Sequence, residues 1–293
     1  MGLRRRVEAT ATAILGLPRV AMLLRVIDRF GRVDGYLLAA GISYNAFFAL
    51  IPLLLFITGI AGLILTDAAS RAALAESLAS LFPPISSLIE DILNGIAQSS
   101  PSASIIGLIL AGWGTSRLFA SLESAISQLD TGEPRRGFVR STTRRVVSVA
   151  VVGGVLILAL LAAPVLSFLQ ERAGEGTTLS GALELLVAVV PPVFASVALI
   201  VVYRIVPLIQ PSWRAVLVPA ILGGLALVIL TRVFTFVAPR LLAGNVIYGT
   251  IGTILVGLTW LDLVFIVIVF CAAWVIERRM LETAAPIDRQ GLG

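Results

Sequence analysis

The sequence contains no histidine and no lysine, and it has a single cysteine, Cys271. Without histidine, the chain lacks the usual general base near neutral pH and the commonest metal ligand. One cysteine excludes an intrachain disulfide, and no cluster of cysteines and histidines can hold zinc, haem or an iron–sulfur centre. We therefore expect no metal and no cofactor.

Charge is also scarce. Only 13% of the residues are charged, whereas 58% are hydrophobic and the mean hydropathy is +1.01. A soluble domain is typically about half apolar and about a quarter charged. An apolar excess that is gathered into long blocks requires a bilayer. The net charge of +5 comes entirely from arginines that cluster beside these blocks, so we expect them to hold cytoplasmic loops and not to bind nucleic acid.

Enzyme motifs are absent from the sequence. There is no P-loop, no G-x-S-x-G and no H-E-x-x-H. The acidic residues Glu123, Asp130, Glu133 and Glu277 are scattered among arginines and do not form a tight carboxylate cluster for two-metal hydrolysis. We therefore expect that the protein is not an enzyme.

Six apolar blocks are long enough to cross about 30 Å of hydrocarbon, which takes roughly 20 helical residues. The sequence therefore predicts an all-α, polytopic membrane protein with six transmembrane helices. The predicted spans are Gly35–Leu65, Ser104–Leu122, Val146–Leu169, Leu185–Tyr203, Ala215–Ala238 and Thr250–Ile276.

Arginine counts in the segments before, between and after these spans run 7, 1, 5, 1, 2, 1 and 3 along the chain. Arginine-rich segments face the cytoplasm, so this alternation predicts six spans with both termini on the cytoplasmic side of the membrane. The arginines near the N-terminus could suggest a signal peptide, but we find no convincing cleavage site and expect this segment to be retained. The predicted organisation is a basic N-terminal segment at 1–34, a transmembrane domain at 35–276 and a cytoplasmic tail at 277–293.

Two predicted segments do not span. Residues 17–33 place apolar side chains at helical spacing among four arginines, which favours an amphipathic helix on the cytoplasmic leaflet or a simple positive-inside anchor. The outside connection at 66–103 contains a strong helical period and a second short helix, and it predicts a helical hairpin. That hairpin would be either a lid over a cavity or a packed cap.

Charges inside spans are costly and are usually functional. Asp262 lies near the middle of the sixth span, about 18 Å from the outer boundary, and Arg117 lies at about 20 Å in the second span, counting 1.5 Å per residue. The similar depths predict that the two side chains face each other or share a polar cavity. They would form either a structural ion pair or a site for a charged substrate group or coupling ion. Arg232 in the fifth span is shallower.

The first span opens on the polar patch Ser43-Tyr44-Asn45, which would line a cavity or pack against another helix. Prolines inside helices free a carbonyl and bend the helix, and Pro52, Pro191 and Pro219 are candidate kinks. Glycine pairs such as Gly223-Gly224 most simply allow close helix packing. Such contacts form between chains as well as within one chain, so the glycines are compatible with a homo-oligomer as well as with a monomer.

Three motifs resemble the YihY/BrkB family. The run from Gly41 to Leu55 resembles its first-span signature, and Pro211-Ser212-Trp213-Arg214 followed by Pro219 and Gly223-Gly224 is similar to its fifth span. Tyr248-Gly249, Gly252 and Leu258-Thr259-Trp260-Leu261 are similar to its last span. The resemblance covers about residues 25–280 and implies a six-helix protein of the bacterial cytoplasmic membrane. Members were labelled ribonuclease BN, a label regarded as a misassignment, and transport or lipid handling is the usual expectation.

The chain departs from this family's pattern at two places. Asp262 stands where the resemblance implies an aromatic or neutral residue. Cys271-Ala272-Ala273-Trp274-Val275 stands where it implies Gly-Ala-Glu, an apolar residue and Asn. The usual intramembrane Glu and Asn are therefore missing, and Asp262 lies about two and a half turns before Cys271 on the same helix.

Two functional hypotheses follow, and a membrane-bound nuclease is set aside. The first is a transporter or lipid-translocating protein with a polar intramembrane path. The second is a membrane scaffold for envelope assembly that binds no substrate. The expected partners are membrane lipids and, for a transporter, a small-molecule or lipid substrate. The candidate path residues are Ser43, Tyr44, Asn45, Arg117, Arg232, Tyr248 and Asp262.

Overall fold

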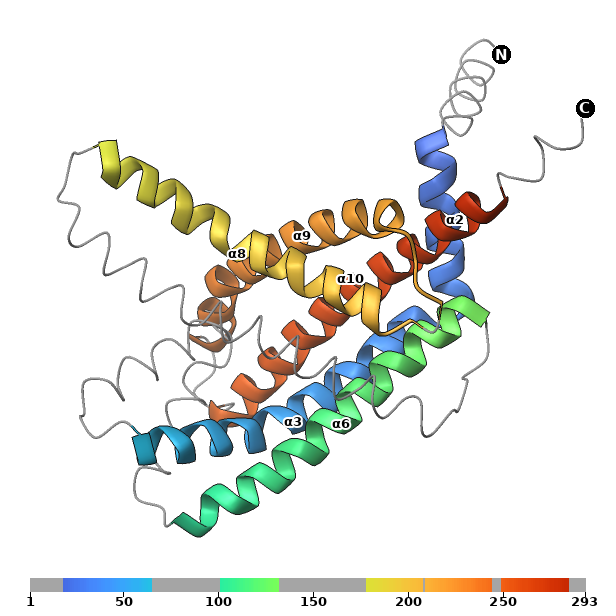
Figure 1. The fold of residues 1–293 in the computed structure, drawn as a ribbon. Coiled ribbons are helices and arrows are strands. Elements are labelled where there is room, and N and C mark those ends of the chain that lie inside the picture. Colours follow the sequence, from blue (N-terminus) through green and yellow to red (C-terminus); the bar gives the residue numbers. More distant parts are fainter. Residues whose placement is uncertain (1–17, 65–100, 132–177, 208, 244–248, 285–293) are drawn as a thin grey trace, which may run out of the picture.

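The computed structural model describes residues 18–64, 101–131, 178–207, 209–243 and 249–284 (Figure 1). Within these ranges the chain is helical apart from short connections. The described helices are α2 (Pro18–Arg32), α3 (Gly35–Ile64), α6 (Pro101–Thr131), α8 (Thr178–Ile205), α9 (Trp213–Ala243) and α10 (Gly249–Ala284).

The last helix, α10, is the centre of the arrangement. It contacts α2, α3, α6, α8 and α9. In Figure 1 it runs between the pair α3 and α6 on one side and the pair α8 and α9 on the other. The N-terminal helix α2 lies beside the C-terminal part of α10, so the two ends of the described chain meet at one end of the bundle.

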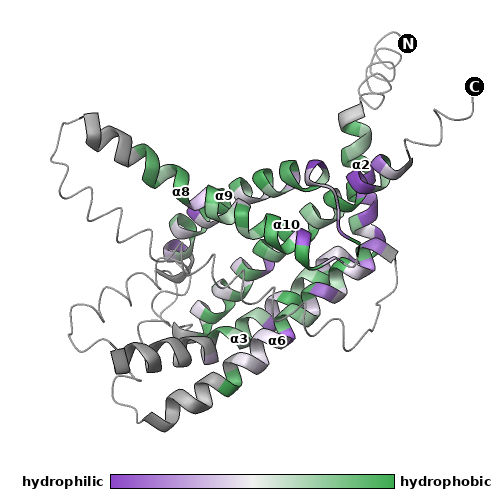
Figure 2. Ribbon diagram, viewed as in Figure 1, coloured by the Kyte–Doolittle hydropathy of each residue, from purple (hydrophilic) through white to green (hydrophobic). Residues whose placement is uncertain are grey.

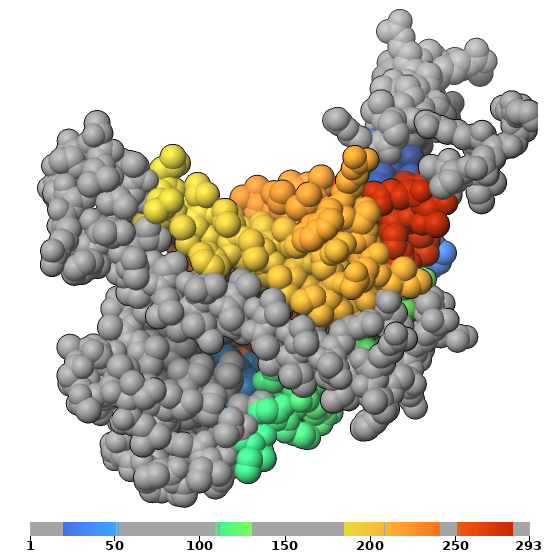
Figure 3. Space-filling model, in the orientation of Figure 1, coloured from blue at the N-terminus to red at the C-terminus, as the bar shows by residue number. Residues whose placement is uncertain are grey.

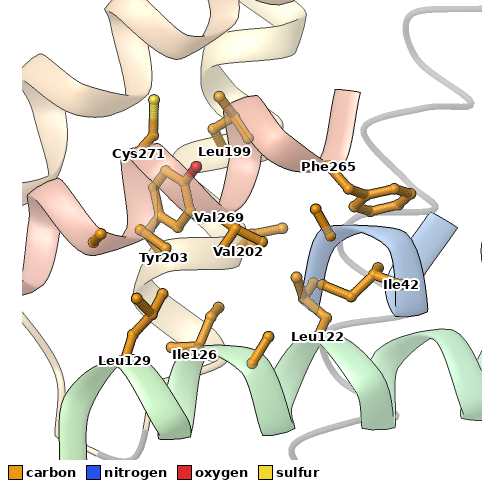
Figure 4. Packing of buried hydrophobic residues seen from close by; sticks show 14 of the residues in the cluster. Ile42, Leu122, Ile126, Leu129, Leu199, Val202, Tyr203, Phe265, Val269 and Cys271 are labelled. Atoms are coloured by element: carbon orange, nitrogen blue, oxygen red, sulfur yellow. The ribbon is translucent and has the colours of Figure 1, made fainter. Parts of the chain in front are cut away.

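The core between these helices is almost entirely apolar. Figure 4 shows α10 contributing Phe265, Val269 and Cys271 to a cluster that also takes side chains from α3, α6 and α8. Tyr203 of α8 is only 1% exposed, and its hydroxyl donates a hydrogen bond of 2.8 Å to the Ile268 carbonyl of α10. Its one polar atom is therefore satisfied within the core, as burial requires.

A sharp corner joins α2 to α3. Asp34 adopts a left-handed φ of 51°, and the two helices meet at a bend of 64°. At this corner Phe30 lies against Gly35, where a Cβ would come within 2.5 Å of the ring, so a glycine is required there.

Among the described residues, three helices are long and apolar enough to cross a membrane, Leu185–Ile205, Trp213–Arg240 and Ile251–Thr283, and the bent α2–α3 pair is a fourth if it is one span. The three helices match the predicted fourth, fifth and sixth spans closely. Helix α3 covers the predicted first span, but the fourth candidate also includes α2, which the sequence predicts not to span. The second predicted span is helical as part of α6, which carries three charged side chains in its second half. The predicted third span and the 66–103 hairpin lie outside the described residues, so the count of six spans stays a prediction.

Helix α10 extends further toward the C-terminus than the sequence predicts. The predicted tail begins at residue 277, but α10 continues to Ala284. Its last two turns are not loose, because Glu277 and Arg279 are largely buried against other helices. The hydrophobic block ends before the helix does.

Large apolar side chains cover the outer faces of α8 and α9. Leu185, Val193, Ile221 and Ile229 are each about half exposed or more. In Figure 3 the side chains of α8 and α9 form one continuous area on the face that is drawn. An exposed apolar area of this kind does not occur on a soluble monomer without a partner or a membrane. Together with the apolar helices, it shows that this is a membrane protein.

Candidate functional site

Asp262 is the one acidic residue in the apolar stretch of α10 from Gly249 to Ile276. Its neighbours Trp260 and Leu261 are buried, and Asp262 itself is half-buried. Its Oδ1 atom is inaccessible to solvent and has no hydrogen-bond partner in the part of the chain that the structure describes. A buried carboxylate oxygen without a donor is energetically costly, so this position calls for a partner from elsewhere.

Arg117 on α6 is exposed, and its guanidinium lies 5.0 Å from the centre of the Trp113 ring. The predicted ion pair between Arg117 and Asp262 is not among the ion pairs that join described residues. Whether they face each other or share a polar cavity, as the sequence predicts, stays a prediction. The arginine is stabilised by an aromatic ring of its own helix through a cation–π contact.

The two charges nevertheless lie at similar depth. Asp130 of α6 and Glu277 of α10 both belong to the ionic contacts at the α2 end of the bundle. Counted along the helices from these residues, Arg117 is about 20 Å and Asp262 about 22 Å away. Both positions therefore lie at similar distances from this end of the bundle.

The polar side chains of the α3 patch bond or pack within their own helix. The Ser43 hydroxyl donates to the Ala40 carbonyl at 2.8 Å, and the Asn45 amide donates to the Gly41 carbonyl at 2.9 Å. Tyr44 is exposed and its ring lies 4.6 Å from that of Phe48 on the same helix. Successive helical residues differ by about 100° in direction, so three adjacent polar residues cannot share one face.

The remaining predicted residues are distributed through the bundle. Arg232 is exposed on α9. Tyr248 lies outside the described residues. Pro52, Pro191 and Pro219 lie inside α3, α8 and α9, and these helices continue through them. Among the described residues, no hydrogen bond or ion pair joins the predicted path residues to one another.

An ionic cluster that was not predicted from the sequence lies at the α2 end of the bundle and is formed by Arg29, Glu277, Arg279 and Asp130. Arg29 of α2 forms an ion pair of 2.5 Å with Glu277 of α10, with side-chain exposures of only 14% and 8%. Arg29 also donates a hydrogen bond of 2.7 Å to the Leu129 carbonyl at the end of α6. One arginine therefore ties α2 to both α10 and α6.

The second ion pair of the cluster joins Arg279 of α10 to both carboxylate oxygens of Asp130 on α6. Arg279 also donates to the Ile209 carbonyl in the α8–α9 connection at 3.3 Å. Ser212 in the same connection donates to Glu282 at 2.5 Å. Figure 2 shows hydrophilic residues gathered where α2, the end of α10 and this connection meet.

The sequence contains a signal that could have indicated this cluster. Glu277 and Arg279 directly follow the last apolar block, with no helix-breaking residue between them and that block. Charges that continue an apolar helix without a break face either solvent or a charged partner. Counting arginines by segment treats them as loop charges and cannot show which are paired.

The second departure from the YihY/BrkB pattern, at Cys271–Val275, falls in the core. Ala273 and Val275 are 0% and 2% exposed, and Cys271 is also buried. The resemblance implies Glu at the position of Ala273 and Asn at the position of Val275. In this chain they are apolar and packed, so no charge is available there. Among the described residues, no group of three or more acidic or cysteine side chains is arranged to hold a metal ion.

Comparison with known proteins gives one family. The family model described as Virulence factor BrkB matches residues 26–290, which is nearly the whole chain. The search of curated proteins and the search of solved structures each gave no match. The matched range contains all of α3, α6, α8, α9 and α10 and the end of α2, so the motifs and the helical membrane fold agree with it. The chain belongs to the Virulence factor BrkB family of membrane proteins.

Proposed function

We propose that the protein is a transporter or lipid-translocating protein of the bacterial cytoplasmic membrane, and that Asp262 binds a charged substrate group or a coupling ion. The observation that carries this proposal is the buried Oδ1 atom of Asp262, which has no donor among the described residues. Ionisable groups at this depth are expensive to keep and are typically paired or functional. A ligand that brings a donor or a cation would remove the cost.

The proposed orientation places both termini in the cytoplasm. The arginine counts support it, because the residues on α2, in the α8–α9 connection and at the end of α10 come from three arginine-rich segments. These segments meet at one end of the bundle, as a single membrane face requires. Six spans remain part of the proposal.

The alternative is a non-catalytic scaffold for envelope assembly. It is supported by the side-chain hydrogen bonds of Ser43 and Asn45, whose donors are satisfied within α3. In that case the Asp262 side chain would matter only through stability. Neither reading includes an enzyme activity or a nucleic-acid partner.

Mass spectrometry of the lipids and small molecules retained by gently purified protein separates the two proposals. We expect wild-type protein to retain a specific compound, and Asp262→Asn to bind it roughly 10- to 100-fold more weakly, because a hydrogen bond to a charged group is lost. Asp28→Asn is the matched control, since Asp28 is an exposed carboxylate in an ion pair with Arg32 on the surface of α2. The same nonspecific lipids in all three proteins would favour the scaffold.

The orientation has its own test. Cys271 is the only cysteine and is buried, so single cysteines can be introduced in a Cys271→Ala background. A membrane-impermeant maleimide is added to cells whose outer membrane is permeable and whose cytoplasmic membrane is intact. We expect it to label Ser99→Cys. We expect Thr10→Cys to stay unlabelled until the cells are lysed. The reverse pattern would contradict the proposed orientation, and labelling at both positions would contradict the odd number of spans between them.

A further inference from the structure

Arg117 stands in an unusual environment for an arginine inside a membrane helix. It shares one face of α6 with Trp113 and Ile109, which are spaced four residues apart and are 59% and 66% exposed. This face is therefore turned away from the core that the described helices form. A cation on a face that meets lipid is costly unless it is paired.

Two other arginines over aromatic rings, Arg204 and Arg240, have an additional acceptor, whereas none of the described residues provides one for Arg117. Arg204 lies over Trp213 and donates to the Pro211 carbonyl at 2.5 Å. Arg240 lies over Phe236 and donates to the Phe236 carbonyl at 2.5 Å. For Arg117 the structure gives the Trp113 ring as its contact, with no carboxylate or carbonyl acceptor among the described residues.

The geometry determines what kind of ligand is missing. Stacking uses the flat face of the guanidinium and leaves the N–H groups at its edge free. Those N–H groups match two oxygens of a phosphate or carboxylate in a bidentate arrangement. An anion bound there would neutralise the charge without disturbing the contact with Trp113.

We propose that Arg117 and Trp113 form a binding site for the phosphate of a phospholipid headgroup. The apolar surface beside it, Ile109 and Leu110, suits the acyl chains of a lipid, whereas a free phosphate ion would have to leave water for an apolar surface. The site lies about 20 Å from the ionic cluster along α6, so it would hold the headgroup well inside the hydrocarbon. This inference rests on the proposed function and names phospholipid as its substrate class.

Native mass spectrometry of delipidated protein tests the site with defined probes. The protein is titrated with phosphatidylglycerol, with diacylglycerol of the same chains, and with inorganic phosphate. We expect wild-type protein to bind phosphatidylglycerol and not diacylglycerol, and Arg117→Gln to weaken that binding by roughly 10- to 100-fold. Arg117→Lys should weaken it less, because lysine keeps the charge but lacks the bidentate edge. Trp113→Leu should also weaken it.

Arg240→Gln is the matched control, because Arg240 is also an exposed arginine over an aromatic ring but already has the Phe236 carbonyl as its acceptor. Thermal unfolding of each variant checks that it is folded, and an exposed position such as 117 should tolerate glutamine. Equal phosphatidylglycerol binding by wild type and Arg117→Gln would overturn the inference, as would equal binding of diacylglycerol. Displacement of the lipid by inorganic phosphate at comparable concentration would show a free-anion site instead.

Failure of this inference and failure of the proposed function give different results. If Arg117→Gln binds phosphatidylglycerol like wild type while Asp262→Asn loses its retained compound, the proposed function stands and the phosphate site does not. If Arg117→Gln loses the lipid while Asp262→Asn behaves like wild type, the phosphate site stands and the role of Asp262 falls.

Discussion

Glu277→Leu is expected to destabilise the folded bundle by about 3–5 kcal/mol, the range found when one partner of a buried ion pair is removed. Arg29 would keep its charge but lose its carboxylate, and both side chains are largely shielded from solvent. The remaining hydrogen bond to the Leu129 carbonyl cannot neutralise a cation. Unfolding in mixed detergent micelles with increasing dodecyl sulfate measures this loss.

Two further variants show whether the charge itself causes the effect. The double variant Arg29→Met with Glu277→Leu should recover much of the loss, because replacing both charges by apolar groups of similar size is often near neutral. Asp28→Leu is the control, since the Asp28–Arg32 pair is about two-thirds exposed and contributes at most about 1 kcal/mol. A loss for Glu277→Leu no larger than that of Asp28→Leu would contradict the importance of the cluster.

Gly224→Ala is the substitution with the next largest expected effect, a loss of about 1–3 kcal/mol from overpacking. A Cβ at Gly224 would lie 2.6 Å from the backbone nitrogen of Ser196 and 2.9 Å from its Cα. Backbone atoms cannot rotate away, so α8 and α9 would have to separate. The close approach of these helices is the packing that small residues allow in membranes.

Two other glycines provide a graded comparison in the same unfolding measurement. Gly223→Ala should cost less than Gly224→Ala, because its close neighbours are the side-chain ends of Leu199 and Cys271 at 2.8 and 3.0 Å. Gly112→Ala meets nothing within 4 Å and should be neutral or stabilising by up to about 1 kcal/mol, since alanine favours helix. Equal effects at all three positions would mean that the α8–α9 contact does not depend on Gly224.

Helices whose ends coincide with the ends of an apolar block could be predicted well. The first predicted span, Gly35–Leu65, corresponds to α3 at Gly35–Ile64, because a block of apolar residues bounded by charges has one solution in a bilayer. The end of α10 could not be predicted in this way. Hydropathy marks where charges begin, but the helix continues for two turns because Glu277 and Arg279 find partners on α2 and α6.

The candidate site could be predicted only in part. Asp262 is identifiable from sequence because a single acid in an apolar helix is conspicuous. Whether its side chain points toward Arg117 cannot be predicted. The sequence gives the distance of each residue along its helix, but it does not give the rotation of each helix about its own axis. The same uncertainty applies to Ser43, Tyr44 and Asn45, which are adjacent in sequence but differ in burial and in contacts.

Translocation of a fluorescent phospholipid across the bilayer of proteoliposomes tests the proposed function most directly. Vesicles containing labelled phosphatidylglycerol are treated with a membrane-impermeant quencher, so label that moves to the outer leaflet during the assay is lost. We expect wild-type protein to increase this loss above that of protein-free vesicles, and Asp262→Asn and Arg117→Gln to abolish most of the increase while Asp28→Asn does not. Wild-type vesicles that behave like protein-free vesicles would contradict lipid translocation, and an equal increase with Asp262→Asn would remove Asp262 from the path.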